Sequence, residues 1–437
     1  MSGLHDQIGK RALELLPEWE SAFWASEAAN IPEYCFYPDT HLAAQWNEPE
    51  KLSYYEKYCL LPDGHCIPHG PVDSEWNSVV FAGNSDPALA DDIIHYYLKT
   101  ILDRLREKEI TESARFAGTF AHLLQDSCIP VHAVNNILIN RLFPDRDGKY
   151  FFYHRLVDGW PFCPERISGK PELLGRTLEE TAFVAGENLT GRIEHGMGLL
   201  VPFLIAIRDG RKEEADLISQ IMNADAVKIT MDLWHTLFSI AFHRISAEET
   251  KKLAHRNLTD SRMILSCDTK FNRERFIEAG IPFYPTLYPN SDPCRARLST
   301  DPYPYEPAVD SAYDGKGNVI PLALRIGKER VQSERGIAAG GYGIASYRVP
   351  GGLYSELDVY AGVHPDSASD QEVTFGIWCH ETEKPLLALG KASRKTDALH
   401  FVVQLPESCR TVSLLSAGGN RDTSGIWLKP MLKSRIG

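Results

Sequence analysis

Residues 118–133, GTFAHLLQDSCIPVHA, contain a pattern that is typical of a metal-binding helix. His122 and Asp126 are four residues apart, so on a helix both side chains project from one face and can bind the same metal ion. Pro130 ends such a helix, and His132 follows just beyond it. The segment therefore predicts a helix that presents a histidine and an aspartate to a metal centre, with a further candidate ligand behind it.

The same spacing recurs at residues 151–160, FFYHRLVDGW, where His154 and Asp158 form a second pair. One such pair is common on protein surfaces, but two pairs with an additional histidine favour a metal centre. The nine cysteines contain no C-x-x-C motif. Imidazole and carboxylate ligands without thiolates suit catalytic zinc, which keeps one position open for water.

The rest of the chain divides into regions of different pattern. Up to about residue 258, apolar residues recur at spacings of three and four, which predicts a mainly α-helical domain at 1–258. Pro, Tyr, Asp and Ser crowd residues 259–318, which indicates an extended linker packed against one or both domains. Short β-rich runs separated by Gly then predict a β-sandwich at 319–437.

Composition narrows the possible functions. The 437 residues carry a formal net charge of −13, from 46 basic and 59 acidic side chains, which disfavours a broad nucleic-acid-binding surface. No segment has the length and apolar character of a transmembrane helix, and the first residues lack the apolar core of a signal peptide. We expect a secreted or periplasmic protein if a signal peptide was removed, and a cytoplasmic one otherwise.

The helical half resembles the zinc-dependent phospholipase C family, which is similar in fold to the single-strand-specific zinc nucleases. The two histidine–aspartate motifs described above carry the resemblance. GLHDQIGKRALELL at 3–16 and CFYPD at 35–39 also resemble the start of the catalytic domain of glycosylphosphatidylinositol-specific phospholipase D. The resemblance covers residues 3 to 250 and implies a helical domain with two or three zinc ions in a cleft.

The same resemblance implies the ligands of each ion. One zinc would be held by Asp39, His122, Asp126 and a histidine of the HCIPHGP loop at 65–71. The second would be held by His132, His154 and Asp158, and the third by His5, Asp126 and the amino terminus. We favour His69 over His65 as the loop ligand, because the prolines around it restrict its backbone. Asp39 would also act as the catalytic proton acceptor.

The second half resembles the NPCBM-type carbohydrate-binding β-sandwich, through the Gly-rich run at 336–366 and the closing GIWLKPML at 425–432. That resemblance implies that loops bind glycan, with these candidate residues: Trp378, His380, Asn420, Asp422 and Trp427. Trp378 and Trp427 are the substrate-binding residues that we predict. In the alternative interpretation these aromatic residues belong to the sandwich core.

Together the two halves predict a zinc-dependent phosphodiesterase of the phospholipase C type, acting on a lipid- or glycan-linked phosphodiester. Three alternatives stay open. They are a nuclease that uses the same centre, a zinc hydrolase of a glycosidic bond, and a glycan-binding protein with a degenerate metal site.

Overall fold

The computed structural model describes residues 4–40, 49–62, 87–132, 143, 153–258, 308–314, 318–338, 343–349, 352–379, 381–419 and 423–435. The chain forms two compact units, Met1–Ser246 and Ala247–Gly437. The sequence predicted a helical domain up to residue 258, whereas the structure places the division twelve residues earlier. The reason is that residues 255–257 form a strand that pairs within the second unit.

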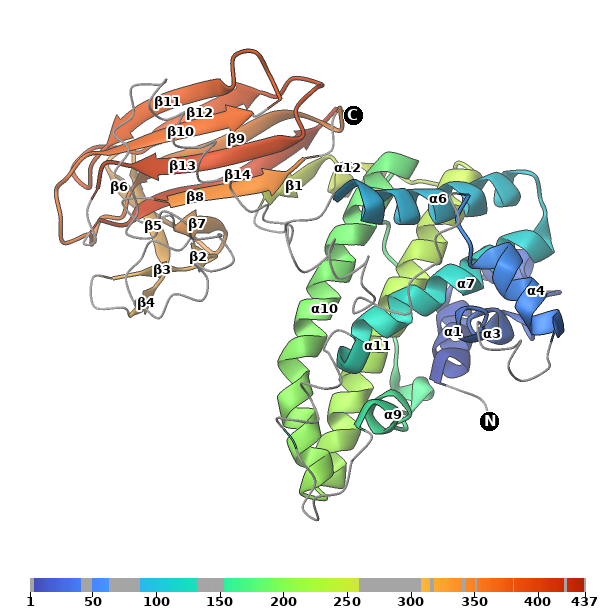
Figure 1. The fold of residues 1–437 in the computed structure, drawn as a ribbon. Helices are drawn as coiled ribbons and strands as arrows, with labels where there is room; N and C mark the ends of the chain where they lie inside the picture. Colours follow the sequence, from blue (N-terminus) through green and yellow to red (C-terminus); the bar gives the residue numbers. More distant parts are fainter. Residues whose placement is uncertain are drawn as a thin grey trace. The chain divides into compact units, whose positions relative to one another are not determined.

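The first unit is helical (Figure 1). Its described helices are α1 (Leu4–Leu15), α2 (Glu18–Phe23), α3 (Ile31–Tyr34), α4 (Pro49–Tyr58), α6 (Pro87–Arg106), α7 (Ile110–Cys128), η2 (Pro130–His132), α9 (Tyr153–Asp158), η3 (Pro164–Arg166), α10 (Leu178–Arg208) and α11 (Lys212–Ala241).

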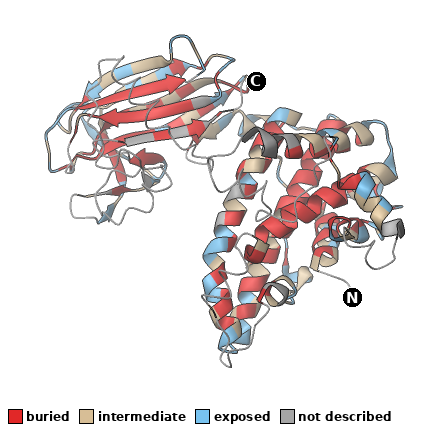
Figure 2. Cartoon of the chain, viewed as in Figure 1, coloured by how far each residue is buried: buried red, intermediate tan, exposed pale blue. Residues whose placement is uncertain are grey.

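Helix α7 is the centre of this unit. Helices α1, α3, α6, α10 and α11 all pack against it, and nearly every residue from Ser113 to Cys128 is buried (Figure 2). The helix ends at Cys128 because Pro130 has no backbone N–H and disfavours helical backbone at the preceding residue. Polar residues on α7 therefore lie inside the protein, where each requires a specific partner.

The two longest of the described helices, α10 and α11, form an antiparallel hairpin beside α7 (Figure 1). Thr177 precedes α10 and its side chain accepts a hydrogen bond from the backbone N–H of Glu180, which satisfies one of the unpaired donors of the first turn. The aromatic core of the unit includes Trp24, which packs edge-on against Trp234 of α11.

The second unit is a β-sandwich preceded by a short helix, α12 (Ala247–Leu253) (Figure 1). Its described strands are β1 (His255–Asn257), β2 (Ala308–Val309), β3 (Ala312–Tyr313), β4 (Val319–Ile320), β5 (Leu322–Ile326), β6 (Glu329–Ser333), β7 (Gly336–Ala338), β8 (Gly343–Arg348), β9 (Tyr354–Val363), β10 (Val373–Cys379), β11 (Leu386–Ala392), β12 (Leu399–Gln404), β13 (Thr411–Ala417) and β14 (Gly425–Ser434).

One sheet has the strand order β12-β9-β14-β7-β2, with β1 also paired to β14, and the other has the order β11-β10-β13-β8. All described pairings are antiparallel, with Trp427 opposite Ala361 and Cys379 opposite Val412. Phe375 of one sheet packs edge-on against Trp427 of the other at a centroid distance of 5.5 Å, so the core lies between the sheets. Two hairpins, β3-β4 and β5-β6, complete the described strands.

The structure confirms the predicted fold class, a mainly helical domain followed by a β-sandwich. Most of the predicted linker at 259–318 lies outside the described residues, but its end contains β2 and β3. None of the described helices has both the length and the apolar character that a membrane-spanning helix requires.

Candidate metal centre

Asp126 lies at the centre of a cluster of histidines. Its Oδ1 is 3.3 Å from Nε2 of His5 and 3.5 Å from Nε2 of His132, and its Oδ2 is 3.1 Å from Nε2 of His122. The three histidines come from α1, α7 and η2, so separate segments bring three imidazole nitrogens to one carboxylate. The predicted helix at 118–128 is present, and His122 and Asp126 share one of its faces.

Hydrogen bonds hold two of these imidazoles by their opposite nitrogens. Nδ1 of His122 lies 2.7 Å from the backbone oxygen of Cys35, and Nδ1 of His5 lies 2.8 Å from Oε1 of Gln125. Because both partners are acceptors, each Nδ1 donates a proton, which leaves Nε2 as the nitrogen that can bind a metal once it has lost its own proton. The rings of His5 and His122 also stack, with centroids 4.2 Å apart. Metal-binding histidines have this arrangement, in which the outer nitrogen donates to a fixed acceptor.

The carboxylate of Asp126 has an unusual environment for an ionised group. The residue is 1% exposed, and the Nε2 atoms of three histidines lie 3.1 to 3.5 Å from its oxygens. A buried, ionised carboxylate is costly unless hydrogen bonds or cations compensate its charge. The position of Asp126 among three Nε2 atoms therefore fits a bound divalent cation.

Without a metal, protonation of neighbouring histidines partly compensates the negative charge of Asp126. Burial lowers the pKa of His122, but the charge and hydrogen bonding of Asp126 outweigh it and raise the pKa to about 9. Burial acts in the same way on His132, and Asp126 and Asp158 raise its pKa to about 9. Burial raises the pKa of Asp126, yet the neighbouring histidines bring it far below its usual value. The centre thus favours an ionised carboxylate next to protonated His122 and His132.

Asp126 belongs to two sets of three candidate metal ligands. Oδ1 of Asp158 lies 3.3 Å from Nε2 of His132, so Asp126, His132 and Asp158 have ligand atoms close enough for one ion. His5, His122 and Asp126 form another such group. Asp126 belongs to both, which is the arrangement of a bridging carboxylate. Both groups consist of imidazole and carboxylate ligands, which suit zinc.

Asp39 lies at the accessible edge of the centre. Its side chain is 45% exposed, and its Oδ1 is 3.8 Å from Nε2 of His122. The side chain of Asp158 is also accessible, at 34% exposed, whereas His122 and Asp126 are at 1%. The two outer carboxylates therefore face solvent, and the buried ligands lie behind them.

The position of α3 depends on a close contact with α7. A Cβ atom on Gly118 would lie 2.5 Å from Cβ of Tyr34 and 3.3 Å from the backbone nitrogen of Cys35, so only glycine permits this approach. The contact brings the carbonyl group of Cys35 to His122. The same contact fixes the position at which the segment from Cys35 to Asp39 begins. Within this segment, the backbone N–H of Asp39 donates to the oxygen of Phe36.

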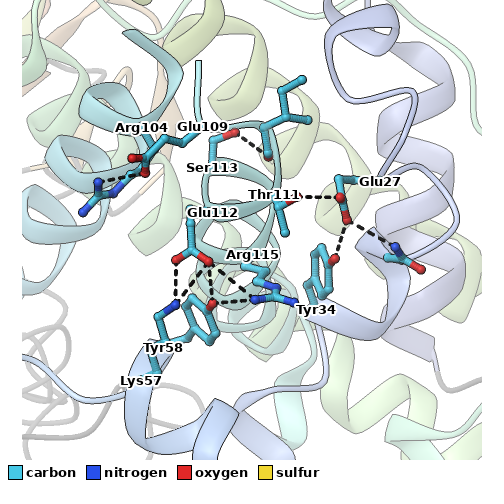
Figure 3. A network of polar contacts seen from close by, with 12 residues as sticks. Glu27, Tyr34, Lys57, Tyr58, Arg104, Glu109, Thr111, Glu112, Ser113 and Arg115 are labelled. Atoms are coloured by element: carbon cyan, nitrogen blue, oxygen red, sulfur yellow. Dashed lines mark hydrogen bonds and ion pairs between the residues drawn. The ribbon is translucent and has the colours of Figure 1, made fainter. Parts of the chain in front are cut away.

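A polar network holds the same two helices together (Figure 3). The carboxylate of Glu27 accepts hydrogen bonds from Tyr34 of α3 and Thr111 of α7. The guanidinium group of Arg115 lies over the ring of Tyr34 and donates to the hydroxyl group of Tyr58. Arg115 is seven residues before His122 on α7, so the network lies about two turns from the metal centre.

The structure brings together five of the eight predicted metal ligands: His5, His122, Asp126, His132 and Asp158. Asp39 lies beside them. His154 is in α9, but its side chain is not among those that the structure describes. His65 and His69 lie outside the described residues. Their role as ligands stays a prediction.

Three contributors were absent from the sequence interpretation. The oxygen of Cys35 comes from the backbone, so no side-chain pattern reveals it. Gln125 directly precedes Asp126, and an amide next to a candidate ligand is the one signal that could have indicated it. Gly118 begins the quoted segment, yet its contact with Tyr34 depends on tertiary packing.

The predicted substrate-binding role of Trp378 and Trp427 requires correction. Trp378 is 3% exposed and Trp427 is 0% exposed, and Trp427 packs between the two sheets against Phe375. Neither indole offers an accessible face to a glycan, so the alternative interpretation as core residues is the one that the structure favours. His380, Asn420 and Asp422 lie outside the described residues.

No protein-family model matches the chain, and no curated protein matches it. Among solved structures, the chain is similar to alpha-toxin from Clostridium absonum, with 10% identity, 99% of this chain and 97% of that chain covered, and a TM-score of 0.34. It is also similar to alpha-toxin from an avian strain of Clostridium perfringens, with 11% identity, 98% and 86% covered, and a TM-score of 0.31.

A smaller part of the chain is similar to CBM51 modules. The CBM51 of Clostridium perfringens GH95, solved with methyl-galactose, matches 29% of this chain and 88% of its own, with 18% identity and a TM-score of 0.25. The CBM51-2 and INT domains of Clostridium perfringens ZmpB, solved with GlcNAc, match 29% of this chain with 19% identity and a TM-score of 0.25. That match spans 27% of the ZmpB chain.

Proposed function

We propose that the helical unit is a zinc-dependent hydrolase of phosphodiesters, of the phospholipase C type. One observation carries the proposal. Nε2 atoms of three histidines from three segments surround the buried carboxylate of Asp126 at 3.1 to 3.5 Å, and two of these histidines have their other nitrogen fixed by an acceptor. A purely structural ion pair does not require three imidazoles around one carboxylate.

The chain would hold zinc with its two adjoining groups. His5, His122 and Asp126 would bind one ion, and Asp126, His132 and Asp158 another. We propose that His69 and His154 complete the coordination. When bound, Zn²⁺ supplies Lewis acidity, which lowers the pKa of water toward neutrality and offsets the negative charge that develops on phosphate oxygens.

The outer carboxylates then have separate tasks. Oδ1 of Asp39 is accessible and close to His122, so it can accept the proton of the attacking water. Asp158 would bind the same ion as His132, since its Oδ1 lies 3.3 Å from Nε2 of His132. His122 and Asp126 are buried, and the exclusion of solvent there strengthens their electrostatic interactions.

For the substrate we propose a lipid- or glycan-linked phosphodiester. Carbohydrate binding by the β-sandwich would deliver such a molecule, and it would use loop residues instead of Trp378 and Trp427. The net charge of −13 disfavours the nuclease alternative, since a nucleic-acid backbone requires a basic surface.

The test combines metal analysis with an activity assay. We expect the purified protein to contain two or three zinc ions per chain by plasma mass spectrometry, and to hydrolyse bis(p-nitrophenyl) phosphate in a chelator-sensitive manner. Asp126→Asn and His132→Ala should lose zinc and turnover together. His400→Ala, which changes an exposed histidine of the sandwich, is the matched control and should keep both.

Each other outcome contradicts a specific part of the proposal. A protein without zinc would refute the metal centre. Zinc without turnover of any phosphodiester would refute the bond that we assign and favour a different hydrolysis, such as that of a glycoside. Faster turnover of single-stranded DNA than of phospholipid or glycan-linked substrates would favour the nuclease.

A further inference from the structure

We propose that Cys379, Glu381 and Cys409 form a separate, thiolate-rich site in the β-sandwich that binds a thiophilic divalent cation such as Zn²⁺. This site belongs to the second unit and uses none of the residues of the helical centre. The inference does not depend on the proposed hydrolase function.

The spacing of the ligand atoms supports coordination of a single ion. The two Sγ atoms and one carboxylate oxygen all lie within 4.8 Å of one another, and Sγ of Cys379 is 3.9 Å from Oε2 of Glu381. With Zn–S bonds of about 2.3 Å and Zn–O bonds of about 2.0 Å, tetrahedral ligands lie roughly 3.5 to 3.8 Å apart. Small side-chain adjustments would therefore bring all three atoms to a common ion.

The fold positions the two cysteines from different segments. Cys379 is the last residue of β10, where it pairs with Val412 of β13, and its backbone N–H donates to the oxygen of Pro385 at 2.8 Å. Cys409 follows a turn in which its own N–H donates to the oxygen of Pro406 at 3.0 Å. Backbone hydrogen bonds thus fix the main chain at both cysteines before any metal binds.

The third ligand is held by the segment that carries Cys409. The backbone N–H of Arg410 donates to Oε2 of Glu381 at 2.8 Å, which orients the carboxylate toward the sulfur atoms. Such outer hydrogen bonds are typical of metal-binding carboxylates. Glu381 is exposed, while Cys379 and Cys409 are 0% and 2% exposed, so an ion can enter from the side of the carboxylate.

The donor set decides which ions would bind. Two thiolates and a carboxylate favour zinc over calcium or magnesium, which prefer oxygen ligands. Three protein ligands leave a fourth position for water. The cysteines bind as thiolates, so binding releases their two protons. An ion here would join the end of β10 to the segment before β13.

Cobalt distinguishes this site from the helical centre, because only thiolate ligands give a sulfur-to-cobalt charge-transfer band in the near ultraviolet. The full-length protein is reduced, stripped of metal and titrated with Co²⁺ alone. We expect the band to appear and to stop growing when its intensity corresponds to one thiolate-bound cobalt ion per chain. Cys379→Ser and Cys409→Ser should abolish it. Glu381→Gln, which keeps an oxygen acceptor for the N–H of Arg410 but removes the charge, should weaken cobalt binding at least about tenfold.

Two control variants establish whether the band arises from this pair of cysteines. Cys163→Ser changes a partly exposed cysteine of the helical unit and should keep the band. His122→Ala should also keep it, even though that variant disrupts the helical centre. No band in the reduced wild type would overturn the inference. So would a band that survives in both Cys379→Ser and Cys409→Ser, or a Cys379–Cys409 disulfide whose reduction restores no cobalt binding.

Discussion

Gly118 provides a direct test of how the fold positions the metal ligands, through the substitution Gly118→Ala. The new Cβ would lie 2.5 Å from Cβ of Tyr34, so α3 must move away by about 0.9 Å to reach an ordinary contact of at least 3.4 Å. If the carbonyl group of Cys35 moves away from His122 by the same distance, its 2.7 Å hydrogen bond with Nδ1 of His122 lengthens to about 3.6 Å, beyond hydrogen-bond range.

The effects on stability and on the metal centre should differ. Overpacking costs about 1 to 3 kcal/mol, while replacing a helical glycine by alanine contributes about 1 kcal/mol in the opposite direction. Loss of the hydrogen bond of His122 adds about 0.5 to 1.5 kcal/mol, so the free energy of unfolding of the metal-free protein should fall by no more than about 3.5 kcal/mol. Zinc affinity should fall by about 10- to 100-fold, because His122 loses the acceptor that orients its ring.

The assay measures zinc affinity by competition with a chromophoric chelator, together with urea unfolding of the metal-free protein. Gly198→Ala is the matched control, since Gly198 is also helical but a Cβ there would meet no atom within 4 Å. It should stabilise the protein slightly and leave zinc affinity unchanged. If Gly118→Ala kept wild-type zinc affinity, the contact between α3 and α7 would not position the centre, and the reasoning would be refuted.

Four further predictions concern charge and protonation. Asp126→Asn should lower zinc affinity at least about 100-fold, because both candidate ligand groups lose the carboxylate that they share. Competition titration measures the affinity, and a near-normal value would contradict the bridging role of Asp126. Zinc binding should release protons at pH 7, since the pKa of His122 and His132 is about 9 without metal, so apparent affinity should rise with pH up to about 9. Calorimetry in two buffers of different ionisation enthalpy detects this release, and buffer-independent heats would contradict it. The same raised pKa values stabilise the metal-free fold below the ordinary histidine pKa of about 6.5, and this stabilisation is lost as pH rises through about 9. Glu27→Gln should lower the free energy of unfolding by about 1 to 3 kcal/mol, because Tyr34 and Thr111 lose a charged acceptor. An unchanged midpoint of urea unfolding would show that the polar network around Glu27 does not stabilise the protein.

Local periodicity predicted much of the helical unit. The four-residue spacing placed His122 and Asp126 on one face of a helix before any tertiary information, and Pro130 marked its end. Convergence of His5 and His132 on the same carboxylate could not be worked out in this way, because it depends on the packing of α1 and η2 against α7. The family resemblance, and not the spacing, suggested His5.

The two tryptophans show where strand patterns carry little information. In a half-exposed strand, alternate residues face solvent, so an aromatic position can be assigned to a face. Every residue of β10 is buried, and most residues of β14 are too, so alternation distinguishes no binding face there. Trp378 and Trp427 therefore looked as suitable for a glycan as for the core.

The pairing of β1 with β14 has a practical consequence for fragments of this protein. His255, Arg256 and Asn257 cover the part of β14 from Met431 to Lys433, along the edge that β7 leaves unpaired. A fragment that begins at residue 319, as composition alone would suggest, removes this strand and exposes backbone donors and acceptors that invite aggregation. A sandwich intended for glycan-array or crystallisation work should therefore begin at or before Ala247.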